Sequence, residues 1–203
     1  MSGEDRRRQL LRSAIGIFAQ RGFAGTKTRD IAAAAGVSEA ILFRHFATKE
    51  ELYHAILDAK EDKGAAAKLS RDLEDCAGRR ADEALFRHLA AEILRSFRED
   101  PAFHRLIMYA SLEGHLLANL FHERFALPVG GFLRRYIVLR QKEGAFRKCD
   151  PDMAVMFALG TIAHYAMGRY VFEMKKFQLS DNVVMEELVE LVMGGLRKRG
   201  TGQ

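Results

Sequence analysis

The sequence is poor in cysteine and proline. Its 203 residues include 2 cysteines and 3 prolines. Cys76 and Cys149 lie far apart and form neither a Cys-x-x-Cys pair nor a Cys/His cluster. This pattern excludes a disulfide framework and gives no sign of a zinc site, so we expect two plain thiols, no bound metal and no cofactor.

Long apolar runs are also missing. The longest apolar stretch, from Ala154 to Met167, is interrupted by Gly160, Thr161 and His164 and falls short of the roughly 20 residues that a membrane span needs. The N-terminal residues lack the apolar core and small-residue cleavage site of a signal peptide. We therefore expect no membrane partner and a cytoplasmic protein.

The common catalytic motifs do not occur either. The sequence has no nucleophile elbow, phosphate loop or dinucleotide fingerprint. A di-metal helical enzyme needs two Glu-x-x-His pairs, whereas this chain has one, Glu51 to His54. Glu51 is explained as a capping residue, because it follows Thr48 by three residues and completes a capping box at the start of a helix. We expect no enzyme and no catalytic residue.

A helical adaptor that binds proteins is a further alternative. Such an adaptor would bind DNA no better than any other basic protein.

Alternating Val, Ile and Thr, which are typical of β-strands, are absent too. Instead, apolar residues recur at spacings of three and four, which predicts an all-α fold. The expected helices cover residues 4–21, 28–35, 38–46, 49–73, 81–98, 101–122, 127–143, 151–177 and 181–199.

Residues 28–46 carry the clearest functional pattern, two short helices that meet at Gly36-Val37-Ser38. Ala32 is small enough for the helices to approach closely, Gly36 accepts a left-handed turn, and Ser38 caps the second helix. Helices this short must be held by packing on the preceding helix. The pattern predicts a helix-turn-helix, and the net charge of +5 is compatible with a polyanionic partner.

The predicted DNA-binding residues fall into two groups. One lies at the start and on the outer face of the second helix, where a major groove would meet it. The other flanks the unit with hydroxyls and cations that can hold phosphates. The first group is Ser38, Glu39, Ala40, Phe43, Arg44 and His45, and the second is Thr26, Lys27, Thr28, Arg29 and Lys49.

Over residues 6–55 the sequence resembles the DNA-binding domain of the tetracycline-repressor-like (TetR) family. The matching positions are Phe18, Gly22, Thr26, Thr28, Ile31, Ala32, Ala35, Gly36, Val37, Ser38, Leu42, Phe43, His45, Phe46, Lys49 and Leu52. The sequence departs from the family pattern at Phe43, where tyrosine is usual, and at Ala40, where glycine is frequent.

The resemblance implies the organisation of the whole chain. It implies a helix-turn-helix domain over residues 1–48, a connector helix over about 49–73, and a regulatory and dimerisation domain over residues 49–203. The implied function is that of a homodimeric transcriptional regulator, usually a repressor, which binds a double-stranded DNA operator and is released from it by a small molecule.

The C-terminal helices supply candidates for the effector site and the dimer interface. The last two helices carry more apolar residues than one buried face needs, so we expect one face to meet a second subunit. The dimer candidates are Met156, Gly160, Ala163, Met167, Leu188, Leu191 and Val192. The candidates for binding an unidentified, partly apolar effector are Met108, Tyr109, Glu113, His115, Phe121, Phe125, Phe157, Thr161, His164 and Tyr165. For each of these an ordinary core position is the alternative, His164 included.

Overall fold

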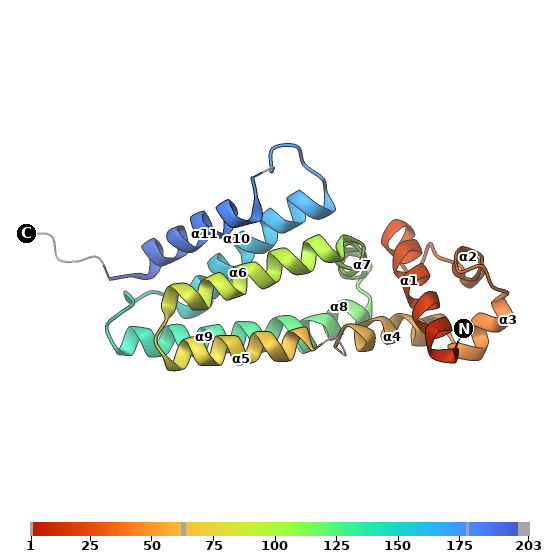
Figure 1. Cartoon of the computed structure of the whole chain (residues 1–203), viewed down its shortest axis with the longest axis horizontal. Helices are drawn as coiled ribbons and strands as arrows, with labels where there is room; N and C mark the ends of the chain where they lie inside the picture. The colour runs from red at the N-terminus through yellow and green to blue at the C-terminus, as the bar shows by residue number, and fades with distance from the viewer. Residues whose placement is uncertain (1, 62–63, 178, 199–203) are drawn as a thin grey trace, which may run out of the picture. The chain divides into compact units, whose positions relative to one another are not determined.

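A computed structural model of the chain describes residues 2–61, 64–177 and 179–198, and within these ranges the elements are helices joined by turns and loops, without a strand (Figure 1). The expected all-α fold is confirmed. None of the helices in these ranges is both long enough and apolar enough to cross a bilayer. The chain forms two compact units, one from Met1–Gly64 with Asp100–Glu123 and the other from Ala65–Glu99 with Arg124–Gln203.

The first unit contains the predicted helix-turn-helix. Its helices are α1 (Gly3–Arg21), α2 (Thr28–Ala34), α3 (Glu39–His45), α4 (Lys49–Glu61), α7 (Pro101–Leu112) and α8 (Leu116–Phe121). α1 begins with a capping box between Ser2 and Asp5, and α7 begins where Pro101 follows the capping residue Asp100.

The core of the first unit is built from apolar residues of all these helices. Phe18 of α1, Leu42 of α3 and Tyr53 of α4 are completely buried. α1 packs against α2, α4 and α7. α2 in turn packs against α3. Since α2 and α3 have only seven residues each, these contacts supply the stability that such short helices lack by themselves.

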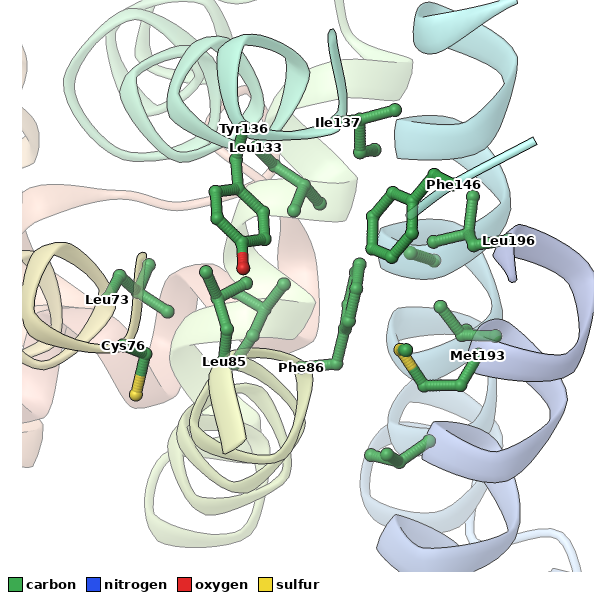
Figure 2. Packing of buried hydrophobic residues seen from close by; sticks show 14 residues of the cluster. Leu73, Cys76, Leu85, Phe86, Leu133, Tyr136, Ile137, Phe146, Met193 and Leu196 are labelled. Atoms are coloured by element: carbon green, nitrogen blue, oxygen red, sulfur yellow. The ribbon is translucent and has the colours of Figure 1, made fainter. Parts of the chain in front are cut away.

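The second unit is a bundle of longer helices, α5 (Ala65–Gly78), α6 (Asp82–Glu99), α9 (Leu127–Lys142), α10 (Pro151–Ala166) and α11 (Asp181–Leu196). α6 contacts α5, α10 and α11. Figure 2 shows Leu85 and Phe86 of α6, Tyr136 of α9 and Met193 of α11 gathered in the space between their helices. This apolar cluster holds the bundle together.

A polar group also ties α6 to α9. Arg140 donates two hydrogen bonds of 2.8 Å to the carboxylate of Asp82, and the Tyr136 hydroxyl donates a third of 2.5 Å. Burial and the Asp82 carboxylate raise the pKa of Tyr136. Hydrogen bonds from two partners therefore satisfy the carboxylate at the start of α6.

Three of the predicted helices are interrupted. The helix expected over 49–73 is described as α4 and α5, with residues 62–63 outside the described residues and Gly64 before α5 at φ +66°, and the one expected over 101–122 is split into α7 and α8 at Gly114, φ +64°. The helix expected over 151–177 continues from α10 into a π-helical turn, Met167–Val171, and ends there. Positive φ at glycine ends a helix at little cost, and this explains the break at Gly114.

Candidate nucleic-acid interface

The turn between α2 and α3 has the geometry that its sequence predicts. Gly36 adopts φ +65°, and the amide of Val37 donates a 3.0 Å hydrogen bond to the Ala32 carbonyl. Ser38 caps α3 by accepting a hydrogen bond from the amide of Ile41. These local contacts therefore shape the turn between the two helices.

Two side chains of α1 hold the ends of both short helices. The amide of Gln9 donates a 2.8 Å hydrogen bond to the carbonyl of Ala35, where α2 ends. The guanidinium of Arg7 donates one of the same length to the carbonyl of His45, the last residue of α3, and lies 4.2 Å from the centre of the Phe46 ring. Sequence reasoning did not find this pair, which we call the α1 clamp, because each contact joins residues 26 or more positions apart.

The predicted groove-facing residues lie on the outer surface of α3. Glu39, Ala40, Phe43 and Arg44 are exposed, whereas His45 is half-buried and its carbonyl is held by Arg7. The hydroxyl of Thr28 donates a hydrogen bond to the Glu39 carboxylate. α3 thus presents a carboxylate, a guanidinium and two apolar groups on one face.

The flanking residues differ in their exposure and in their hydrogen bonds. Lys27 and Arg29 are exposed. Thr26 is 2% exposed, and its hydroxyl donates to the Gly22 carbonyl at 2.7 Å. Lys49 donates hydrogen bonds of 2.8 and 3.0 Å to the carbonyls of Phe23 and Thr26, and its ammonium lies 4.0 Å from the Phe23 ring centre. In this conformation Thr26 and Lys49 stabilise the loop between α1 and α2.

The turn between α7 and α8 contacts the same loop. The Glu113 carboxylate accepts a 3.0 Å hydrogen bond from the amide of Phe23. It also packs over Gly22, where an added Cβ would lie 2.2 Å from the Glu113 Oε1 atom. Tyr109, another effector candidate, donates a 3.4 Å hydrogen bond to the carbonyl of Gln20. Both side chains are thus engaged with the end of α1.

His115 completes this contact. Its ring lies 4.3 Å from the Phe23 ring and 4.7 Å from the Tyr53 ring, centre to centre, and its Nδ1 atom accepts a hydrogen bond from the amide of Leu117 at the start of α8. Burial lowers the pKa of His115 and raises that of Tyr53. The neutral imidazole is therefore the form that fits here.

The other effector candidates are distributed over both units. Met108 and Phe121 are half-buried in the first unit, and Phe125 is half-buried in the second. In the second unit Phe157 and His164 are exposed, and the hydroxyls of Thr161 and Tyr165 donate to the carbonyls of Phe157 and Leu179 at 2.5 and 3.2 Å.

The dimer candidates divide by exposure. Met156 and Leu191 are 65% and 61% exposed, Gly160 is exposed, and Ala163 and Met167 are half-buried. Val192 is buried in the core of the second unit, and Leu188 packs against a second apolar cluster of that unit. Sequence reasoning did not include Met153, which is 61% exposed on the same helix as Met156.

Comparison with known proteins points to one family for the N-terminal part. Residues 10–56 match the family model of the bacterial regulatory proteins, tetR family. A helix-turn-helix-type transcriptional repressor of Mycobacterium tuberculosis is 49% identical over 49 residues, which are 24% of this chain and 26% of that protein. The chain thus matches about a quarter of the length of that relative.

Two other comparisons extend over nearly the whole chain. The helix-turn-helix-type transcriptional regulator RutR of Escherichia coli is 29% identical over 206 residues, covering 96% of this chain and 92% of RutR. The solved structure of the transcriptional regulator FadR from Bacillus subtilis, in complex with stearoyl-CoA, superposes with a TM-score of 0.65 at 18% identity, covering 93% of this chain and 98% of that one. The latter similarity concerns the fold.

Proposed function

We propose that the chain is a transcriptional regulator that binds one DNA operator sequence specifically, because residues 10–56 match the family model of the bacterial regulatory proteins, tetR family. The observation that carries the proposal is the geometry of α3. Its outer face is exposed and chemically mixed, and its last carbonyl is held by Arg7 of α1. A rigid helix with such a face can enter a major groove and contact base edges.

The residues of the interface take different roles in this proposal. Glu39, Ala40, Phe43 and Arg44 of α3 face the bases, and the exposed Lys27 and Arg29, together with the half-buried Thr28, face the phosphate backbone. Thr26 and Lys49 fix the loop that presents α2. Ser38 and His45 contribute through their cap and backbone positions at the two ends of α3.

We propose further that the regulator is a repressor with a small-molecule effector. The relative from Mycobacterium tuberculosis is named a repressor, and the Bacillus subtilis FadR structure contains stearoyl-CoA. A partly apolar effector would release the protein by preferring a conformation that binds the operator poorly. Residues 1–48 would form the DNA-binding domain and residues 49–203 the regulatory and dimerisation domain, with α4 as the first part of the connector.

The same proposal includes a homodimer. Met153, Met156 and Phe157 expose apolar side chains on α10, as does Leu191 on α11. Burial of this face against a second copy gives a two-fold dimer, whose two α3 helices can meet half-sites about 34 Å apart. A regulator of this kind acts on chromosomal DNA, which agrees with a cytoplasmic location, and enzymatic activity is not part of the proposal.

Selection of the preferred site from genomic fragments tests the central proposal. The dissociation constant is then measured for the selected site and for a scrambled sequence, at several salt concentrations from about 50 to about 200 mM. The logarithm of the affinity should fall with the logarithm of the salt concentration, with a slope of about 0.9 per phosphate contact. We expect tight binding to the selected site alone, with an affinity that falls steeply as salt rises. Equal binding to the scrambled sequence would refute sequence-specific regulation and favour the adaptor alternative.

Two variants assign roles within the interface. Arg44→Ala should change the preferred bases as well as the affinity, whereas Lys49→Ala should weaken binding to all sequences alike. Arg135→Ala, which removes an exposed arginine of α9 in the second unit, is the matched control for loss of charge. A uniform loss with Arg44→Ala would remove Arg44 from the base-reading set.

Effector release needs a separate measurement. Stearoyl-CoA is the first probe, because it is the molecule held by the FadR structure. We expect an apolar ligand of this class to raise the dissociation constant of the operator complex. If neither stearoyl-CoA nor a panel of apolar carboxylates changes that dissociation constant, the hypothesis that these compounds release the protein from its operator is wrong. The proposal of operator binding is unaffected by this result.

A further inference from the structure

We propose that Phe43 reads the methyl group of a thymine in the operator, an inference that rests on the proposed DNA-binding function. Phe43 is 45% exposed, whereas Leu42 beside it and Phe46 one turn later are completely buried. Among the described residues of α1 to α4, it is the one large apolar side chain that is exposed. The core is therefore complete without the Phe43 ring.

The surroundings of the ring define what it can recognise. Ala40 and Glu39 precede Phe43 by three and four residues and lie on the same side of α3, and Arg44 follows directly. Ala40 and Phe43 thus form an apolar strip between a carboxylate and a guanidinium, all of them exposed. A phenyl ring at this place offers neither a donor nor an acceptor to a base edge or a phosphate.

The major groove contains one apolar group that matches such a strip. The other base-edge features in that groove are hydrogen-bond donors and acceptors, whereas thymine presents its C5-methyl group there. Cytosine carries hydrogen at the same carbon and a donor beside it. Contact with the Phe43 ring would therefore favour thymine at one position of each half-site.

The position of the ring is fixed by the rest of the first unit. Arg7 holds the carbonyl of His45 two residues beyond Phe43, and the Thr28 hydroxyl holds the Glu39 carboxylate one turn before it. A short helix held at both ends carries its side chains to a defined depth in the groove. This allows a single methyl group to be distinguished.

Replacement of thymine by deoxyuridine tests the inference, because it removes the methyl group and leaves all hydrogen-bonding groups in place. Each thymine of the selected operator is exchanged in turn, and the dissociation constant is measured at fixed salt. Burial of one methyl group corresponds to about fourfold in affinity, so we expect about fourfold weaker binding at one thymine per half-site and roughly 15-fold when both are exchanged.

Variants of Phe43 connect the effect to its ring. Phe43→Ala should bind the thymine and uracil operators equally, and Phe43→Tyr should keep the preference for thymine. Leu112→Ala, which shortens an exposed side chain of α7 in the same unit, should leave unchanged the ratio of the dissociation constants for the uracil and thymine operators. Circular dichroism of each variant verifies its folding.

Two results would overturn the inference. One is a full thymine preference that persists in Phe43→Ala. The other is a wild-type protein that binds every uracil-substituted operator as tightly as the original while it still rejects scrambled DNA, and this result would leave the proposed function intact. Loss of all discrimination between the operator and scrambled DNA would instead refute the proposed function itself.

Discussion

Single residues decide how the loop between α1 and α2 is held. Lys49 binds two of its carbonyls, and Glu113 binds the amide of Phe23. Both side chains were expected to contact a ligand, either phosphate or effector, and that expectation remains a proposal. Their observed partners show that α4 and the turn before α8 both support this loop. The contact from the turn before α8 includes a titratable ring, His115.

The His115 ring gives the first unit a pH-dependent stability. Burial lowers the pKa of His115 from its usual 6.5, so the unfolded chain binds a proton at this residue at a higher pH than the folded chain does. The contribution of the neutral ring is complete above about pH 6.5 and decreases as the pH falls from there toward the folded-state pKa.

His115→Asn is the variant that isolates this effect. Asparagine is a good helix N-cap and replaces the ring nitrogen that accepts from Leu117, but it does not titrate. Thermal melts between pH 7.5 and 5.0 should show that the wild-type protein loses stability relative to the variant as the pH falls. Parallel pH profiles for the two proteins would contradict the expectation.

The helix-turn-helix shows which elements a sequence can predict. Short-range features gave the turn correctly, because Gly36 and Ser38 act within three residues of themselves. The break at Gly114 could not be inferred in the same way. A glycine inside an apolar periodic pattern is compatible with both a continuing helix and a positive φ, and only the packing of the whole unit decides between them.

Contacts between distant elements were beyond local reasoning. Arg7 and His45 are 38 positions apart, and Glu113 and Phe23 are 90 apart, so no spacing rule connects them. The apolar excess of α10 and α11 was visible in the sequence. The sequence did not show which of these apolar residues are buried and which are exposed. Val192 is part of the core, whereas Met153 is exposed.

The α1 clamp leads to a prediction about α3. Arg7→Met keeps an aliphatic chain beside Phe46 and removes the hydrogen bond to His45. We expect binding to the operator to weaken about tenfold, a loss of roughly 1.4 kcal/mol, which is close to the lower end of the range for a hydrogen bond from a charged group. Binding to scrambled DNA should change much less, because the phosphate contacts of the other cations remain.

Arg7→Lys is the partner variant for this test, since it keeps the charge and can still donate one hydrogen bond. It should recover part of the operator affinity, as measured by fluorescence anisotropy at constant salt. An equal loss on operator and scrambled DNA for Arg7→Met would indicate that Arg7 acts through its charge instead.

Assembly is the property of the whole molecule that matters most for the proposed function. If the exposed apolar residues of α10 and α11 form the dimer interface, a buried charge there is costly. Leu191→Glu should convert the dimer into a monomer in sedimentation experiments. Operator affinity should then fall by at least about 100-fold, because two linked half-sites bind far more tightly than one.

Leu139→Glu provides a matched control, because Leu139 is an exposed leucine of α9 in the same unit, with 37% exposure. This variant should remain dimeric and keep its operator affinity. A Leu191→Glu protein that is still dimeric would place the interface on another surface.

The two hydrogen bonds from Gln9 and Arg7 to the ends of α2 and α3 also bear on how this region opens. Seven-residue helices would ordinarily fray one by one, and their amide hydrogens would exchange with solvent at different rates. Since Arg7 and Gln9 tie both helices to α1, we expect α2 and α3 to separate from α1 together, in one opening event. Their core amides should therefore exchange with deuterium at one shared opening free energy, as a single cooperative foldon.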